Sequence, residues 1–343
     1  MKKTKPLLGE TGLIDALARV FGPPPPEVAV GIGDDCAVIH LGGEAYALWT
    51  VDTLLEGVHF DLAYISLRQL GRRSLAVNLS DIAAMGGEPA YALLSLGWPS
   101  GRELSGALEL GEGLAELARA YGTAVVGGDS VASPQGVTVT VSVLGRVPKG
   151  EVLTRAGAIP GDFVYVTGSL GESAAGLEVL RRGLKINPEL AGPLIKAHVD
   201  PVPQLAAGRL LAQHRLASAA IDLSDGVATD LFHVCRASRV GARVEAAAVP
   251  LSAGVQAVAR ILNTDPLNLA LKGGEDYHLL FTAHPEQASR LLQVFSQAGL
   301  PRPVKIGEIT AGQEVVLVTP EREEIISGAG FDHFRLDPAS GKE

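Results

Sequence analysis

A stretch rich in proline and glycine divides this chain of 343 residues and limits the folds open to it. The segment, PKGEVLTRAGAIPGD, lies at residues 148–162 and interrupts the patterns typical of regular structure. On each side of it, strand-like apolar runs are interleaved with segments that carry apolar residues at helical spacing. The sequence therefore predicts a mixed α/β (α+β) protein of two domains, residues 1–148 and 149–343.

Local patterns in the first half predict a series of helices and strands. Pro23 to Pro26 predict an extended connection between a short N-terminal helix and the first strand. Residues 67–85 predict a helix that stops at Gly86 and Gly87. Further elements are expected as a strand at 45–53, a strand at 90–99, a helix at 103–122, a buried strand at 123–130 and a half-buried antiparallel strand at 137–147.

The second half repeats this alternation. The expected elements are a strand at 162–168, a helix at 172–183, a strand running through an acidic turn into a helix at 218–238, and a loop running into a strand at 271–283. No repeat strong enough to define a repeat protein connects the two halves.

Six short acidic segments share one design. Each places a carboxylate beside Gly, Ser or Thr, close to an apolar strand or helix: GDD at 33–35, TVDT at 50–53, LSD at 79–81, GGDS at 127–130, DLSDG at 222–226 and GGED at 273–276. A single example is ordinary turn chemistry, but six in one chain indicate a common site. On the predicted helix 67–85, Asn78 and Asp81 are three residues apart and share a face.

Clustered carboxylates repel one another, so a site built from them implies a bound cation. Oxygen ligands without pairs of His or Cys favour Mg²⁺, Ca²⁺ or Mn²⁺ over zinc. Because Mg²⁺ commonly binds through one or two carboxylates together with substrate phosphates, many separate aspartates indicate several ions around a polyphosphate. The neighbouring glycines would let backbone amides approach phosphate oxygens.

Composition excludes several other classes of protein. A formal net charge of −9 argues against a broad nucleic-acid surface. No apolar run is long enough to predict a membrane span, and MKKTKPLLGE lacks the apolar core of a signal peptide, so we expect a cytoplasmic protein. Cys36 and Cys235 lack the spacing of a metal site and are expected to be buried thiols.

The familiar nucleotide motifs are also missing from the sequence. It contains no P-loop, no dinucleotide-binding glycine motif and no protein-kinase motif set. Arg155 is the cation best placed by sequence to neutralise a phosphate, although it could equally be a solvated arginine at the domain boundary.

The motifs resemble those of the thiamine-monophosphate kinase family over nearly the whole chain. They are GIGDDCAVI, TVDTLLEGVHF, LAVNLSDIAAMGGEPAYALLSL, VVGGDS, LTRAGAIPGDFVYVTGSLGESAAGL, AIDLSDGVATDL and LKGGEDYHLLF. Several recur in a wider superfamily that includes aminoimidazole ribonucleotide synthetase. Together, EGVHF at 56–60, NLSDIAAMG at 78–86 and GGEDY at 273–277 favour the kinase.

The resemblance implies transfer of the γ-phosphoryl group of ATP to thiamine monophosphate, with several Mg²⁺ ions, in a homodimer paired through the N-terminal domains. It also implies two domains, each a mixed sheet packed with helices, with the active site between them. Residues at the family's metal-binding positions are Asp35, Thr50, Asp52, Asp81, Asp129, Asp222 and Asp225. Residues at its ATP-binding positions are Gly128, Asp129, Arg155 and Ser224, and those at its substrate-binding positions are His59, Glu275 and Phe331.

One departure from the family concerns the second acidic segment. The family often has Ser-Thr-Asp where this chain has Thr50, Val51 and Asp52. Valine is harmless if the middle residue binds metal through its backbone carbonyl, but a side-chain hydroxyl ligand would be lost.

We predict no general base, because the acceptor is itself a phosphate that is largely ionised near neutral pH. Two alternatives remain open at this point. One is another ATP-using superfamily member, such as aminoimidazole ribonucleotide synthetase. The other is a non-catalytic module that binds metal or nucleotide.

Overall fold

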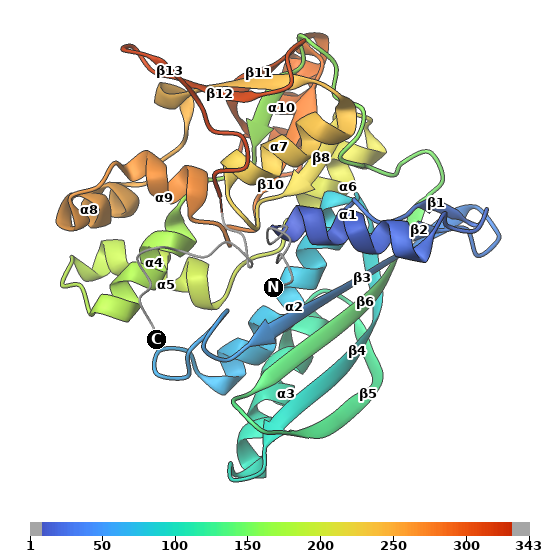
Figure 1. The fold of residues 1–343 in the computed structure, drawn as a ribbon, viewed down its shortest axis with the longest axis vertical. Helices are drawn as coiled ribbons and strands as arrows, with labels where there is room; N and C mark the ends of the chain where they lie inside the picture. Colours follow the sequence, from blue (N-terminus) through green and yellow to red (C-terminus); the bar gives the residue numbers. More distant parts are fainter. Residues whose placement is uncertain (1–8, 331–343) are drawn as a thin grey trace, which may run out of the picture.

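Two mixed β-sheets with helices packed against them make up the fold, and the predicted α/β (α+β) class is confirmed. The computed structural model describes residues 9–330. A six-stranded sheet is built from residues 28–148 and a seven-stranded sheet from residues 163–325 (Figure 1). The domain boundary at 148/149, which falls at the end of the first sheet, stays a proposal.

The first sheet has the strand order β1-β2-β3-β6-β4-β5. All neighbouring strands are antiparallel except β4 and β5, which are parallel. Its elements and the helix that precedes them are α1 (Glu10–Phe21), β1 (Val28–Val30), β2 (Ala37–Ile39), β3 (Ala45–Leu55), α2 (Leu67–Ala84), β4 (Glu88–Pro99), α3 (Leu104–Ala120), β5 (Ala124–Ser133) and β6 (Thr138–Pro148). These elements confirm the helices and strands predicted for the first half, except that β5 is exposed and continues beyond the expected loop.

The second sheet has the strand order β13-β12-β9-β11-β7-β10-β8 and contains one parallel pair, β9 with β12. Its strands are β7 (Phe163–Val166), β8 (Ala219–Asp222), β9 (Gly241–Glu245), β10 (Leu279–Ala283), β11 (Val304–Thr310), β12 (Val315–Val318) and β13 (Glu323–Ile325). Its helices are α4 (Glu172–Arg182), α5 (Pro188–Val199), α6 (Leu205–Gln213), α7 (Val227–Ser238), α8 (Ala253–Leu262), α9 (Pro266–Lys272) and α10 (Ala288–Gln297).

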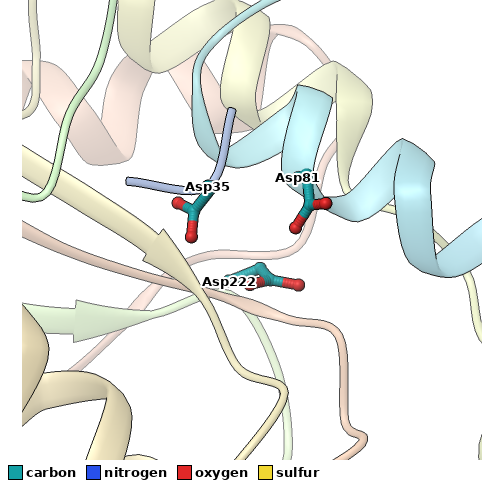
Figure 2. A group of neighbouring side chains, drawn as sticks. All are labelled: Asp35, Asp81 and Asp222. Atoms are coloured by element: carbon teal, nitrogen blue, oxygen red, sulfur yellow. The ribbon is translucent and has the colours of Figure 1, made fainter. Parts of the chain in front are cut away.

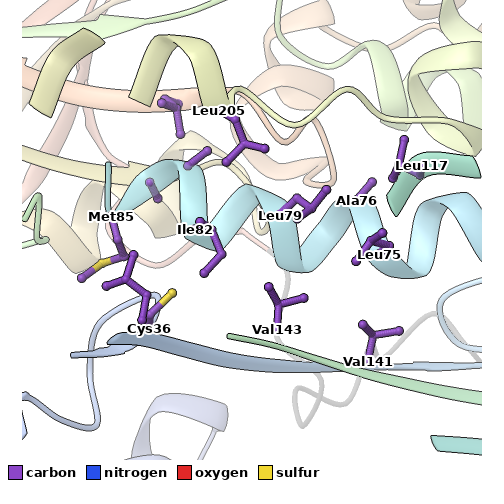
Figure 3. Packing of buried hydrophobic residues seen from close by; sticks show 14 of the residues in the cluster. Cys36, Leu75, Ala76, Leu79, Ile82, Met85, Leu117, Val141, Val143 and Leu205 are labelled. Atoms are coloured by element: carbon purple, nitrogen blue, oxygen red, sulfur yellow. The ribbon is translucent and has the colours of Figure 1, made fainter. Parts of the chain in front are cut away.

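Helix α2 is the central element of the molecule. It begins at a capping box, in which Ser66 and Gln69 exchange hydrogen bonds, and most of its residues are buried. Figure 3 shows Leu75, Leu79 and Ile82 packed among side chains from the first sheet and from α6, so one apolar core joins the two halves of the chain. The predicted helix at 67–85 is confirmed.

Glycines allow α2 to pack closely against α3. A Cβ at Gly71 would lie 1.9 Å from the backbone oxygen of Leu110, and one at Gly113 would lie 1.9 Å from that of Arg68. Any side chain at either position would push the two helices apart. This close packing fixes where α2 presents its polar residues.

The outer face of the first sheet has no cover within the described part of the chain. Helices α2 and α3 lie on the inner face (Figure 1). Side chains that alternate outward along β3, β4 and β5 are exposed, among them Trp49, Val51, Tyr91, Leu93 and Val131. We call this surface the open face.

Residues 9–330 contain no helix that is both long enough and apolar enough to cross a membrane. Cys36 and Cys235 are buried thiols, as predicted.

Candidate active site

Three aspartates from distant parts of the chain converge beside α2. Asp35 lies between β1 and β2, Asp81 lies on α2, and Asp222 is the last residue of β8. One carboxylate oxygen from each lies within 4.8 Å of the other two, and Figure 2 shows the three side chains around a common space. The structure thus brings together predicted metal ligands from both halves of the chain.

Hydroxyl groups hold two of these carboxylates in place. Thr50 Oγ1 on β3 donates a hydrogen bond to Asp81 Oδ2, and Ser80 Oγ donates to Asp222 Oδ2 at 2.7 Å. Asp52 lies on the same inward face of β3 as Thr50. Its carboxyl group is within hydrogen-bond reach of Asp81. We call this group the acid cluster: Asp35, Thr50, Asp52, Asp81 and Asp222.

Ionising the acid cluster is unfavourable without a further cation. Burial raises the pKa of Asp222 to about 8, and the charge of Asp35 adds to this effect. Burial raises the pKa of Asp52 to about 6. Burial, and then the charges of Asp52 and Asp222, raises the pKa of Asp81 well above its usual range. A bound divalent cation would reverse these shifts by stabilising the charged forms.

Arg155 brings a positive charge to the edge of the acid cluster. Its Nε donates to Asp35 Oδ1 at 3.1 Å, and its Nη2 pairs with the same oxygen. Its backbone N–H donates to Asp34 Oδ2, also at 3.1 Å. Asp34 therefore holds the main chain of Arg155, while Asp35 holds its side chain. The other oxygen, Asp35 Oδ2, is buried and has no hydrogen-bond partner within residues 9–330.

Two adjacent loops place the remaining predicted residues of the second half near Asp222. Ser224 and Asp225 follow Asp222 in the turn before α7, where the N–H of Asp225 donates to the buried carboxylate of Asp230 at 3.2 Å. The N–H of Glu275 donates to the backbone oxygen of Ser224 at 2.7 Å. Residues that were predicted to bind metal, ATP and substrate therefore lie side by side.

Asp129 does not join the acid cluster of the same chain. Asp129 pairs with Ser95 on the neighbouring strand β4. Across the next two strands, Ser95 pairs with Thr140 on β6, and Thr140 pairs with Thr53 on β3. Asp129 is therefore three strands from β3, about 14 Å at the usual strand spacing. Because paired residues share a face and successive residues alternate, its side chain lies on the open face, opposite Asp52.

The prediction for the strand that carries Asp129 was wrong in part. Residues 123–130 were expected to form a buried strand that leaves into a loop at GGDS. The strand instead continues to Ser133, and nearly all of its residues are exposed because it is the last strand of the sheet and its outer face is open. Gly128 packs against β4, where a Cβ would lie 1.7 Å from the backbone oxygen of Leu94.

Three further positions were singled out by the resemblance to the kinase family. His59 lies in the turn after β3, where its Nδ1 accepts a hydrogen bond from the N–H of Leu55 at 3.1 Å. Val51 is 61% exposed on the open face, so valine at this position removes no side-chain ligand from the acid cluster. Phe331 lies outside the described residues.

Several residues that support the site carry little signal in the sequence. Asp34 was expected to hold cations with Asp35 as part of GDD, but it accepts a hydrogen bond from the backbone N–H of Arg155. Ser80, which donates to Asp222, was not expected to support the site. Asp230 has no adjacent glycine that would mark it in the sequence. Arg73 is fully buried in α2 and pairs with Glu275, but it is one of several charged residues in this helix and nothing in the sequence distinguishes it.

Comparison with protein families gives two matches that together span most of the chain. The N-terminal domain of AIR synthase related proteins matches residues 33–147, and the C-terminal domain of the same family matches residues 160–319. The thiamine-monophosphate kinase of Escherichia coli strain K12 is 39% identical over 311 residues, which cover 90% of this chain and 93% of the relative. That of Bacillus subtilis strain 168 is 37% identical over 314 residues, covering 90% and 94%.

Solved structures also resemble this chain. AaThiL complexed with AMPPCP and TMP matches with a TM-score of 0.82 at 31% identity, covering 97% of this chain and 100% of the other. HypE of Escherichia coli, a hydrogenase maturation protein, matches with a TM-score of 0.67 at 20% identity, covering 92% and 96%. The HypE likeness concerns the fold alone.

Proposed function

This chain belongs to the thiamine-monophosphate kinases among the AIR synthase related proteins, and from this premise we propose that it phosphorylates thiamine monophosphate with ATP. The products are thiamine diphosphate and ADP. The observation that carries the proposal is the acid cluster, in which carboxylates from both halves of the chain meet within 4.8 Å.

The residues of the acid cluster fit divalent metal ions. Their ligand atoms are hard carboxylate and hydroxyl oxygens, and the buried Asp35 Oδ2 has no hydrogen-bond partner among the described residues. We propose that Asp35, Thr50, Asp52, Asp81, Asp222 and Asp225 hold several Mg²⁺ ions. Bound there, Mg²⁺ would neutralise the negative charge that builds up when a monophosphate meets a triphosphate.

The chain's own contribution to the transfer is positioning and charge. Two unit anions about 4 Å apart repel by roughly 4 kcal/mol at an effective dielectric constant near 20. Arg155 is 20% exposed at the edge of the acid cluster and can shift its guanidinium from Asp35 to a phosphate oxygen of ATP. The acceptor oxygen attacks the γ-phosphorus in line with the departing ADP oxygen, so one P–O bond forms as another breaks.

Thiamine monophosphate would lie between the two halves of the chain. Glu275 is suited to accept a hydrogen bond from the amino group of the pyrimidine ring, and His59 supplies a second polar contact. Phe331 stays a proposed contact for the rings. Ser224 is proposed to contact ATP from the turn beside Glu275.

A homodimer formed through the open face would complete the site. In one chain, Gly128 and Asp129 are three strands from β3, and Asp129 lies on the opposite face from Asp52. If two open faces pack together, Asp129 of one copy can approach the acidic segment of β3 in the other. The exposed apolar side chains of that face would be buried in the same contact.

The direct test is incubation with ATP, Mg²⁺ and thiamine monophosphate, followed by chromatographic detection of thiamine diphosphate. Free thiamine and formylglycinamidine ribonucleotide serve as control acceptors, and Asp222→Asn serves as the inactive control. Release of ADP with the ribonucleotide alone would favour the other ATP-using reaction. ATP binding without ADP release from any acceptor would favour a non-catalytic module.

A mixing experiment tests the shared site. Asp129→Asn and Asp222→Asn are each expected to be inactive, but in a mixed dimer one site would receive both substitutions and the other neither. Random mixing should therefore restore about a quarter of wild-type activity. No recovery, in a sample shown to exchange subunits, would mean that Asp129 does not act across the dimer.

A further inference from the structure

A fully buried arginine on α2 holds the carboxylate of Glu275. Arg73 Nη2 forms an ion pair with Glu275 Oε1, and Arg73 Nη1 lies 3.3 Å from His198 Nε2 on α5. A buried guanidinium is strongly unfavourable unless it is paired and hydrogen-bonded. Arg73 therefore requires these partners, both of which belong to the second half of the chain. We call Arg73, His198, Ser173 and Glu275 the arginine cluster.

The hydrogen bonds also define the state of His198. Burial, and then the charge of Arg73, lowers the pKa of His198 to about 4, so its ring is neutral at pH 7. A guanidinium can only donate, so Nε2 of the ring accepts and Nδ1 carries the proton. Nδ1 lies 3.1 Å from Ser173 Oγ and 3.5 Å from Glu275 Oε2. Each oxygen of Glu275 thus faces a donor from a different helix.

The backbone of the loop before β10 shows why such support is needed. Glu275 and Tyr277 have φ values of 59° and 51°, in the left-handed region that residues other than glycine rarely adopt. Such conformations are unfavourable and persist only where the surroundings fix them. Here the backbone bonds of Glu275 to Ser224 and of Tyr277 to Leu223, together with Arg73, fix the loop.

We propose that Arg73 is a positioning residue for substrate recognition, which orients the Glu275 carboxylate. The inference rests on the proposed function, in which Glu275 contacts thiamine monophosphate. The Glu275 side chain is 25% exposed, so it can bind a ligand while Arg73, with none of its surface exposed, cannot. Loss of Arg73 should therefore weaken the binding of thiamine monophosphate without a comparable change for ATP.

The position of Arg73 on α2 supports separate sites for the organic part of the substrate and for its phosphates. Arg73 and Asp81 are eight residues apart on one helix, which corresponds to about 12 Å along its axis. The arginine cluster and the acid cluster are thus held at a fixed separation by a single rigid element. One end would recognise the organic part of the substrate, and the other would hold the reacting phosphates.

Steady-state kinetics of four variants test the inference. Arg73→Met and Glu275→Gln are each expected to raise KM for thiamine monophosphate by about 10-fold or more, while KM for ATP changes less than about two-fold. The double variant should be no worse than the more severe single one, because both changes remove the same interaction. Arg73→Lys should recover part of the loss, since it keeps the charge without the forked geometry.

The matched control is Arg72→Met. Arg72 is the next residue on α2 and also forms an ion pair with the second half of the chain, to Asp200 at 2.7 Å, but it does not contact Glu275. Its KM for thiamine monophosphate should stay at the wild-type value. If Arg73→Met does not fold, Arg73→Lys carries the test, with an expected rise in KM for thiamine monophosphate alone of about three-fold.

Two results would overturn the inference while leaving the proposed function intact. In the first, Arg73 variants change both KM values equally. In the second, the effects of Arg73→Met and Glu275→Gln multiply in the double variant. If the wild-type protein makes no thiamine diphosphate from thiamine monophosphate, both the proposed function and this inference fail, and the wild-type assay alone reveals it.

Discussion

The acid cluster and the arginine cluster are both buried polar sites on α2, but they balance their charges in different ways. In the arginine cluster, Arg73 supplies a cation for Glu275, and His198 stays neutral. In the acid cluster, Arg155 pairs with Asp35, and the remaining carboxylates face one another. The charges of the arginine cluster are therefore paired within the chain, whereas most of those of the acid cluster are not.

This difference supports the proposal that the arginine cluster binds the organic substrate and the acid cluster binds metal ions. A site whose charges are already paired can orient an organic ligand without changing its own ionisation. A site with unpaired like charges gains most from metal ions and, through them, from phosphates. Four measurements can test the contrast between the clusters, in decreasing order of the change that each should detect.

The largest effect is expected on activity at the acid cluster. Asp222→Asn or Asp52→Asn should lower kcat by about 100-fold or more at saturating Mg²⁺, because each removes a charge that we propose to hold metal and not a group that holds the fold. Circular dichroism spectra and thermal melts of the metal-free variants should match those of the metal-free wild type. Normal turnover by either variant would exclude a role for that residue in metal binding.

The second prediction concerns stability, where the two clusters should respond in opposite ways. In metal-free protein at pH 7, Arg73→Met should lower the free energy of unfolding by about 1–3 kcal/mol, because it leaves partners of a buried cation unpaired. Asp222→Asn should not lower it, because burial has already raised the pKa of Asp222 to about 8 and the neutral amide can still accept from Ser80. Urea denaturation measures both. A similar loss in the two variants would remove the distinction between the clusters.

Much of this architecture could be predicted from the sequence because its periodicity is strong. The apolar spacing over residues 67–85 predicts α2, which spans Leu67–Ala84, and the strict alternation over 137–147 predicts β6, which spans Thr138–Pro148. The acid cluster could be found because glycine and hydroxyl residues mark several of its aspartates. Those signals are local, so they survive in a single sequence.

The remaining features depend on what packs against each element. An apolar run such as AVVGG predicts a strand, but only the sheet order shows that β5 is an edge strand with an open outer face. Arg73 is fully buried although it is charged, because it pairs with Glu275 from the second half of the chain. Its partner Glu275 is 202 positions away, so no local pattern could pair them.

The third prediction couples pH to metal binding. In metal-free protein the pKa values of Asp52 and Asp222, about 6 and about 8, are higher than the unfolded value near 4. The folded state therefore binds more protons, and the contribution of these groups is fully present below about pH 4 and is lost as pH rises through 6 and then 8. Mg²⁺ binds the ionised form, so it should offset this loss.

Thermal melts with and without Mg²⁺ measure the coupling. The rise in Tm caused by millimolar Mg²⁺ should be larger at pH 8 than at pH 6, by about 1–2 °C for each kcal/mol of added stabilisation. Asp222→Asn should reduce the difference, since it removes the carboxyl group whose pKa is about 8. An equal rise at both pH values would mean that Mg²⁺ does not bind at these carboxylates.

The smallest effect is expected at Arg72, and it isolates burial as the cause of the difference at Arg73. Both residues join α2 to the second half of the chain through a carboxylate, but Arg72 and Asp200 are 28% and 24% exposed, whereas Arg73 is 0% exposed. Water can replace the lost partner at an exposed pair, so Arg72→Met should lower the free energy of unfolding by less than about 1 kcal/mol. Urea denaturation of Arg72→Met and Arg73→Met, measured in parallel, compares the two free energies of unfolding. If the two variants lose equal stability, the strength of the arginine cluster comes from joining the two halves of the chain and not from its burial.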